Sequence, residues 1–155
     1  MTKGKFIAFE GGEGSGKTTQ ISLLKESFAK NFPEREVIFT REPGGTPYAE
    51  EIRSVMLGDA AGQANGLTIL GLIMASRADH VFNLILPALE RGATVISDRY
   101  YGSSFAYNIV AQENRKAENI FWAYVENLPK ADMTIFFDVS PEIAKKRVEI
   151  GRAHV

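Results

Sequence analysis

The chain contains the sequence Gly11-Gly12-Glu13-Gly14-Ser15-Gly16-Lys17-Thr18, which fits the phosphate-binding pattern G-x-x-x-x-G-K-[ST]. In such a loop the glycines let the backbone turn sharply, so that successive N–H groups face phosphate oxygens. The Lys17 side chain can reach β- and γ-phosphates, and the Thr18 hydroxyl can ligate Mg²⁺. A helix that begins here would direct the positive end of its dipole at the same anion.

The sequence on either side of this loop has the pattern that the motif requires. Residues 5–10, Lys-Phe-Ile-Ala-Phe-Glu, form an apolar run of strand length. After the loop, apolar residues recur at helical spacing at Ile21, Leu24, Phe28 and Phe32. The order strand, loop, helix favours a phosphate-binding loop over the alternative, a glycine-rich turn with a surface lysine.

Length and composition limit the possible classes of protein. With 155 residues, 45% of them hydrophobic and 24% charged, the chain is expected to form one globular domain. The net charge of −1 does not indicate a nucleic-acid partner. The absence of cysteine excludes disulfides, cysteine-ligated metals and cysteine nucleophiles. The first apolar run is too short for a signal peptide and no segment is expected to span a membrane, so we expect a cytoplasmic protein.

Strand and helix patterns alternate along the rest of the chain. Further strands are predicted at residues 36–40, 93–97 and 131–139. The predicted helices cover residues 47–57, 67–91 with a kink at Pro87, 117–128, and a segment that starts at Pro141. Thr46 and Ser140 are placed to cap two of them. This alternation predicts an α/β fold, a parallel sheet with helices on both faces.

Charged residues follow the predicted strands where the strands end. Arg41 comes after the second strand, and Asp98 and Arg99 come after the third. The carboxyl ends of strands in an open α/β sheet share one crevice, where Asp98 suits an Mg²⁺ or phosphate site and Arg99 can clamp a phosphate. One phosphate loop and two further arginines fit transfer of a γ-phosphoryl group to an acceptor phosphate, with Mg²⁺ between. The alternative for Asp98 and Arg99 is a structural ion pair.

Other polar and aromatic residues have less specific interpretations. Arg77 lies on the flank of an apolar helical stripe, so we expect it to be half covered; the alternative is a surface arginine whose stem covers apolar neighbours. Trp122 is predicted to lie in the core. His80 and His154 have no ligand-like neighbours in the sequence, so we interpret both as non-metal residues.

Three segments together resemble the bacterial thymidylate kinases. They are Phe9-Glu10-Gly11-Gly12-Glu13-Gly14-Ser15-Gly16-Lys17-Thr18-Thr19-Gln20, Thr40-Arg41-Glu42-Pro43-Gly44-Gly45-Thr46, and Asp98-Arg99-Tyr100 followed by Ser103-Ser104 and Ala106-Tyr107. Their order and spacing match, and the resemblance covers about residues 3–148. It implies a P-loop nucleoside monophosphate kinase-like fold, and transfer of the ATP γ-phosphoryl group to dTMP, giving dTDP in dTTP biosynthesis. It also implies Mg²⁺ as cofactor and a homodimer formed by helix packing.

The resemblance assigns residues to the donor nucleotide and to the reaction. Lys17, Asp98 and Arg99 would be catalytic, and Thr18 and Asp98 would hold Mg²⁺. ATP would be bound by Gly11, Gly12, Glu13, Gly14, Ser15, Gly16, Lys17, Thr18 and Thr19.

A second set would bind dTMP. The resemblance places Arg99 on the phosphate with Arg41 beside it, Glu13 near the sugar 3′-hydroxyl, and Tyr107 where it crowds the 2′ position. Arg77 would hydrogen-bond the thymine ring, and Ser104 would read the base edge. Pro43 and Ile73 complete this set.

The chain departs from the family pattern at several positions. Ile73 stands where an aromatic ring commonly stacks on thymine, so a contact of roughly 1 kcal/mol is missing. Asn108 replaces a frequent glutamine. The phosphate loop carries no arginine, and in members with this loop type a lid supplies it.

Residues 1–148 are therefore expected to form an incomplete kinase domain, without the lid, the fifth strand and the final helix. Arg152 would be the only lid-like arginine left. We expect residues 149–155, Glu-Ile-Gly-Arg-Ala-His-Val, to be a non-native tail in no secondary structure. One reverse translation of this tail resembles a common sequencing-adapter oligonucleotide.

Other functions remain open at this point. A GTPase-type switch should show N-K-x-D, which the sequence lacks. A deoxynucleoside kinase needs a general base for a neutral hydroxyl rather than two arginines for a phosphate. A catalytically inactive nucleotide binder is the other alternative, and initial rates with dTMP and with thymidine separate these options.

Overall fold

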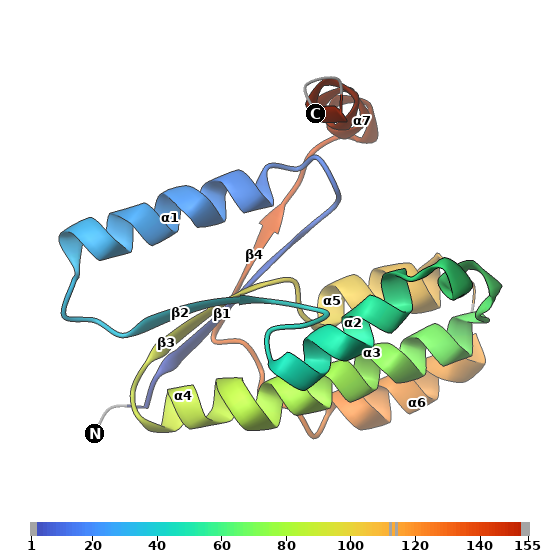
Figure 1. The fold of residues 1–155 in the computed structure, drawn as a ribbon, viewed down its shortest axis with the longest axis horizontal. Helices are drawn as coiled ribbons and strands as arrows, with labels where there is room; N and C mark the ends of the chain where they lie inside the picture. The colour runs from blue at the N-terminus through green and yellow to red at the C-terminus, as the bar shows by residue number, and fades with distance from the viewer. Residues whose placement is uncertain (1–2, 112, 114, 153–155) are drawn as a thin grey trace.

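A parallel four-stranded sheet forms the centre of the protein in this computed structural model (Figure 1), which describes residues 3–111, 113 and 115–152, without the side chains of 115, 116, 150 and 152. The strands are β1 (Lys5–Gly11), β2 (Val37–Arg41), β3 (Thr94–Asp98) and β4 (Met133–Phe137), in the order β2-β3-β1-β4. All three strand pairs are parallel, which confirms the predicted sheet. Their carboxyl ends therefore meet at one edge.

Helices cover both faces of this sheet. Figure 1 shows α1 (Lys17–Asn31) on one side, and α3 (Gly66–His80), α4 (Leu86–Glu90) and α6 (Arg115–Val125) on the other. The remaining α-helices are α2 (Pro47–Leu57), the short α5 (Tyr101–Ser104) and α7 (Pro141–Arg152), and a 3-10 helix, η1 (Asp59–Gln63), follows α2. The Thr46 hydroxyl accepts the Ala49 N–H at 3.3 Å and the Ser140 hydroxyl accepts the Ile143 N–H at 3.4 Å, which confirms both predicted caps.

The long predicted helix is continuous but changes its hydrogen-bond register. Between α3 and α4, residues Val81–Ile85 form a π-helical turn, in which the Leu86 N–H bonds the Val81 carbonyl. Pro87 follows directly and has no N–H to donate. The register change lies beside Pro87, the position at which a kink was predicted. A second π-helical turn, Phe105–Val110, continues α5.

The core lies between β1, β3 and the long helix. Its buried members include Phe6, Ala8, Val81, Ile85 and Val95. The prediction that Trp122 belongs to the core is wrong: the residue is 38% exposed, and its indole N–H donates to Glu118. Its neighbour Phe121, one position along α6, is the fully buried ring.

The helix formed by Gly66–Glu90 corrects another expectation. It has 25 residues and a mean hydropathy of 1.4, so by length and composition it could span a membrane. The expectation that no segment has these properties is therefore wrong. The helix carries the buried polar residues Ser76, Arg77 and His80, whose partners lie in β2 and the loop after it. Such partners are typical of a core helix in a globular domain.

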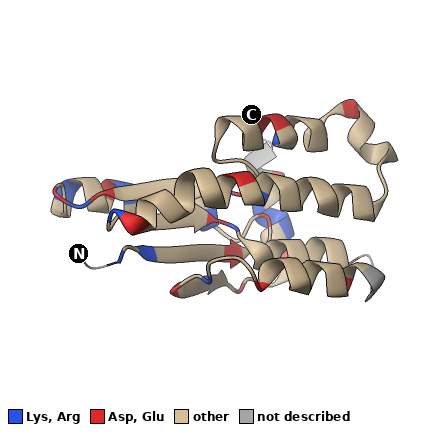
Figure 2. Cartoon of the chain, turned by 90° about the horizontal axis from the view of Figure 1, so that it is seen from below, with Lys and Arg blue, Asp and Glu red and all other residues tan. Residues whose placement is uncertain are grey.

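The end of the described chain also differs from the expectation. Residues 149–152 continue α7, so the prediction of no secondary structure after Val148 is wrong for them. His154 and the end of the predicted tail lie outside the described residues, and the assignment of residues 149–155 as non-native stays a prediction. Figure 2 shows Lys and Arg as well as Asp and Glu on most of the elements, and the net charge is −1.

Candidate active site

Two of the cavities at the carboxyl ends of the strands have Arg99 in their lining. The first, which we call the loop cavity, has a volume of about 460 Å³ and is lined by residues 12–19 of the phosphate loop with Asp98, Arg99 and Arg147. The second, which we call the acceptor cavity, measures about 220 Å³. It is lined by Glu42, Pro43, Ile73, Arg77, Arg99, Tyr100, Ser103, Ser104, Tyr107 and Asn108.

The phosphate loop places a buried lysine at the first cavity. Lys17 is 6% exposed, and its Nζ donates to the Gly11 carbonyl at 2.9 Å and the Gly12 carbonyl at 3.3 Å. Burial lowers the pKa of Lys17, as does the Arg99 guanidinium, while nearby carboxylates led by Asp98 oppose this shift. A phosphate in the loop cavity would add negative charge beside this ammonium group and so stabilise its charged form.

Gly16 explains why the loop can turn directly into α1. It is the N-cap residue with φ of 94°, a left-handed conformation that favours glycine. The exposed Thr18 and Thr19 follow in the first turn of the helix and line the cavity. The first N–H groups of α1 therefore lie beside the loop, as an anion site requires.

Asp98 directs at the same cavity an oxygen that accepts no hydrogen bond from the described residues. Its Oδ1 is buried without a hydrogen-bond partner in the described part of the chain, and Lys17 Nζ lies 4.0 Å away. Among the described residues, no group of three or more His, Cys, Asp and Glu side chains could hold a metal ion. Mg²⁺ in phosphoryl-transfer sites is commonly held by one or two protein ligands and the substrate phosphates. Asp98 and Thr18 fit that smaller ligand set.

Arg99 is held in an unusual conformation between the cavities. Its φ of 72° lies in the left-handed region. Three contacts fix it: its N–H donates to the Phe9 carbonyl at 2.8 Å, the Ser97 hydroxyl donates to its carbonyl at 2.7 Å, and its Nη1 donates to the Ser103 hydroxyl at 3.0 Å. The guanidinium also lies 5.5 Å from the centre of the Tyr107 ring.

Glu10 organises the segment after β3, a role that was not predicted from the sequence. Its buried carboxylate accepts the Tyr100 N–H at 3.0 Å, the Ser103 N–H at 3.2 Å and the Ser103 hydroxyl. Ser103 in turn accepts from Arg99. A carboxylate at the end of an apolar strand, directly before the loop, was the available sequence signal.

Arg77 is the charged residue whose environment differs most from the expectation. It is only 2% exposed, so both the half-covered position and the surface alternative are wrong. Its Nε donates to Glu42 Oε2 at 2.6 Å, and its Nη2 donates to the Ser104 hydroxyl at 2.8 Å. Nη1 is buried and lacks a hydrogen-bond partner within the described residues. An arginine that lines a cavity with one unused donor is suited to bind an acceptor group on a ligand.

The other residues that were predicted to bind dTMP lie at three different places. Pro43, Ile73, Ser104 and Tyr107 line the acceptor cavity, whereas Glu13 lines the loop cavity. Arg41 lines neither cavity: it is the last residue of β2, its side chain is 56% exposed, and its Nη2 donates to Glu50 at 2.9 Å. The structure therefore brings Arg77 and Arg99 together but places Arg41 with Glu50.

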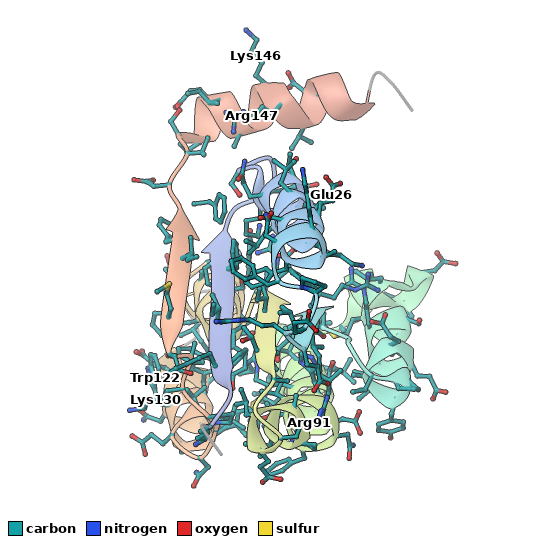
Figure 3. All side chains as sticks on the ribbon, turned by 90° about the vertical axis from the view of Figure 1, so that its left-hand side faces the viewer. Glu26, Arg91, Trp122, Lys130, Lys146 and Arg147 are labelled. Atoms are coloured by element: carbon teal, nitrogen blue, oxygen red, sulfur yellow. The ribbon has the colours of Figure 1, made fainter. Side chains whose placement is uncertain are left out.

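Arg147 on α7 is a site residue that the sequence did not indicate. Its Nη1 donates to the Gly14 carbonyl at 3.4 Å and to the Ser15 carbonyl at 3.5 Å. Figure 3 shows α7 near the start of α1, with Lys146 pointing away from the rest of the chain. Residues 141–152 contain several charged side chains, and nothing in their spacing singles out Arg147.

Comparisons with known proteins agree on one family. The sequence model of the thymidylate kinase family matches residues 9–154. The chain is 43% identical to a thymidylate kinase of Marinomonas sp. (strain MWYL1), and the match covers 98% of this chain and 71% of that protein. It is 44% identical to a thymidylate kinase of Caldicellulosiruptor saccharolyticus, over 96% and 71% of the two chains. The crystal structure of thymidylate kinase from Ehrlichia chaffeensis is similar with a TM-score of 0.79 and 31% identity, over 98% of this chain and 86% of that one.

Proposed function

Because this chain belongs to the thymidylate kinase family, we propose that it transfers the γ-phosphoryl group of ATP to dTMP, giving dTDP for dTTP synthesis. The observation that supports this most directly is the position of Arg99 in the lining of both cavities. A donor in the loop cavity and an acceptor in the acceptor cavity would present their phosphates to the same guanidinium. Positioning and charge neutralisation of this kind account for most catalysis of phosphoryl transfer.

The loop cavity would hold the donor. The backbone N–H groups of residues 11–19 and the Lys17 ammonium group bind the β- and γ-phosphates. Asp98 and the Thr18 hydroxyl would hold Mg²⁺, which supplies further positive charge next to the phosphates when it is bound. Arg147 lines the loop cavity from the side of α7.

The acceptor cavity would hold dTMP with its phosphate at Arg99. An oxygen of that phosphate attacks the γ-phosphorus, the new P–O bond forms as the bond to the β-phosphate oxygen breaks, and ADP leaves. Arg99 neutralises the charge on the acceptor phosphate and so lets the two anions approach.

The nucleoside part of dTMP would lie along α3 and the segment after β3. The unused Nη1 donor of Arg77 would bind a carbonyl oxygen of thymine, with Ser104 beside it. Ile73 provides apolar contact to the base, and Pro43 completes the wall. Tyr107 would limit space at the 2′ position, and Glu13 would lie near the 3′-hydroxyl.

We extend the proposal to a cytoplasmic homodimer that has neither nucleic-acid nor membrane partners. The long helix leaves Leu67 and Phe82 more than half exposed, at 54% and 60%. Packing of this helix against a second copy would cover both side chains.

Initial rates with ATP and either dTMP or thymidine test the reaction. We expect turnover with dTMP and little with thymidine, because thymidine has no phosphate for Arg99. Lys17→Ala shows whether the turnover depends on the phosphate loop: it should lower kcat by roughly 10²–10³ while the far-UV circular dichroism stays the same. Turnover of thymidine alone would indicate a deoxynucleoside kinase, and dTMP binding without turnover an inactive binder.

A further inference from the structure

A buried chain of polar side chains leads away from the acceptor cavity and ends at a histidine. Arg77 Nε donates to Glu42 Oε2 at 2.6 Å, and the other oxygen of Glu42, Oε1, lies 3.1 Å from His80 Nδ1. His80 Nε2 lies 2.7 Å from the Thr40 hydroxyl. His80 is 0% exposed, Arg77 2% and Glu42 5%. The reaction proposed above uses Arg77 and gives His80 no role.

The protonation of His80 follows from its partners. An ionised carboxylate can only accept hydrogen bonds, so the contact with Glu42 requires a proton on Nδ1. In the neutral ring Nε2 is then an acceptor, and the Thr40 hydroxyl donates to it. Thr40 and Glu42 thus bind the two ring nitrogens from opposite sides and fix the tautomer.

The loop after β2 prevents the imidazole from turning away. Gly45, with φ of 96°, packs its backbone so closely that an added Cβ would lie 2.5 Å from both His80 Nε2 and the Thr40 hydroxyl. His80 is therefore a rigid donor to Glu42, and Glu42 is held from one side by His80 and from the other by Arg77.

The contact between His80 and Glu42 determines which nitrogens of Arg77 are left for other partners. With Oε1 occupied by His80, Glu42 binds Arg77 through Nε alone, which leaves Nη2 for Ser104 and Nη1 for a ligand. Without His80, the Glu42 carboxylate could rotate so that its two oxygens accept from Nε and Nη2 together, the paired geometry that arginine favours. Nη2 would then no longer donate to Ser104. The guanidinium would then present Nη1 differently to the cavity.

We propose that His80 is a positioning residue for nucleobase recognition: through Glu42 it orients Arg77 so that Nη1 faces a carbonyl oxygen of the base. The proposal rests on the function proposed above, because it takes a keto pyrimidine nucleotide as the ligand. A base with an amino group at that position cannot accept from Nη1. His80 should therefore influence the preference for dTMP over dCMP without touching either nucleotide.

Two conservative variants separate this role from simple packing. In His80→Asn the amide nitrogen takes the approximate place of Nδ1 and can still donate to Glu42. In His80→Gln the amide nitrogen lies nearer the place of Nε2, toward Thr40. We expect His80→Gln to weaken dTMP binding about tenfold, with dCMP binding and the ATP KM nearly unchanged, and His80→Asn to recover most of the dTMP affinity.

Calorimetric titration with dTMP and with dCMP gives the readout, and thermal unfolding of each variant shows whether it is folded. If the wild-type chain does not bind dTMP, the proposed function fails, and the role of His80 in it fails as well. If the wild type binds dTMP and the two variants lose dTMP and dCMP affinity equally, or lose none, the role of His80 is overturned while the function stands.

A measurement on the wild-type ring covers the case in which His80→Gln does not fold. The chain has two histidines, so His154→Ala leaves His80 as the single imidazole in a ¹⁵N spectrum. We expect a protonated Nδ1 and an unprotonated Nε2, both with and without dTMP. An unprotonated Nδ1 in the dTMP complex would overturn the proposal.

Discussion

Arg99 combines a strained backbone with a central position in the site. A non-glycine residue at a φ of 72° costs on the order of 1–3 kcal/mol, and the contacts with Phe9, Ser97 and Ser103 hold it there. Glycine would adopt the same backbone without this cost. A guanidinium between the two cavities is the evident reason for an arginine at this position.

Two substitutions at this position distinguish the charge from the strain. Arg99→Ala and Arg99→Gly both remove the phosphate contact, so each should weaken dTMP binding by roughly 2–3 kcal/mol. ATP binding should weaken less, because Lys17 and the N–H groups of the phosphate loop still contact the donor phosphates. Arg99→Gly should be more stable than Arg99→Ala by about 1 kcal/mol, because it relieves the left-handed conformation. Calorimetry with each nucleotide and urea unfolding measure the two effects. An unchanged dTMP affinity in either variant would remove Arg99 from the acceptor site.

The sequence identified most of the candidate site but not its contacts. Lys17, Asp98 and Arg99 were predictable because a local pattern places each at a strand end or in the phosphate loop. The burial of Arg77 was not, because its partner Glu42 lies 35 residues away and helical spacing shows only the flank of α3. Arg41 was expected beside Arg99, but its guanidinium forms an ion pair with Glu50 in α2.

At the scale of elements, α7 contributes to the loop cavity through one side chain. The long bonds from Arg147 to the Gly14 and Ser15 carbonyls place positive charge at the loop cavity, where the donor phosphates are proposed to bind. We expect Arg147→Ala to weaken ATP binding about two- to fivefold and to leave dTMP binding unchanged. Lys146→Ala is the matched control, because Lys146 is exposed and points away (Figure 3). Equal losses of ATP affinity in the two variants would show a general charge effect instead.

The connection between β2 and α2 depends on Glu50, and its strength should vary with pH. The Gly45 N–H, and then the Arg41 guanidinium, hold the pKa of Glu50 below its ordinary value of 4.5. A carboxyl with a lowered folded-state pKa stabilises the protein above its unfolded pKa, and this contribution is lost as the pH falls through the folded-state value. The protein should therefore lose the stability that Glu50 contributes below about pH 4.5.

Glu50→Gln tests this dependence. We expect the variant to be less stable than the wild type at pH 7, with a difference that stays constant down to about pH 5 and shrinks at lower pH. Urea unfolding at several pH values between 3 and 7 measures the difference. A gap that widens as the pH falls would contradict the assigned sign.

Element boundaries show which parts of the fold depend on local sequence. The helix Pro47–Leu57 agrees with the predicted start at Pro47 and the predicted end near Leu57, because Thr46, Pro47 and Gly58 mark its ends. Strand β4 is shorter than predicted, at Met133–Phe137 instead of 131–139, since pairing with β1 decides where it begins and ends. The π-helical turns have no sequence signal of their own beyond the nearby Pro87.

At the scale of the whole molecule, the two edge strands of the sheet differ in how much of them is covered. β2 is partly covered along its length, whereas β4, at the other edge, has mostly exposed residues. Phe136 is 67% exposed, Met133 55% and Ile135 36%. Phe136 also lines a cavity of about 540 Å³ with Thr134 and Tyr107. An apolar edge strand of this kind is a template for pairing with other chains.

We therefore expect the 155-residue chain to form assemblies larger than a dimer as its concentration rises. Phe136→Lys should suppress these assemblies, because a charge on an edge strand opposes strand pairing. Phe32→Lys is the matched control: Phe32 is 48% exposed and lies at the end of α1, where it packs on Phe28. Sedimentation velocity over a range of concentrations measures the size distribution. If Phe32→Lys reduced the large assemblies as much as Phe136→Lys, general solubility rather than the β4 edge would control association, and a wild type that never exceeded a dimer would show that this edge does not associate.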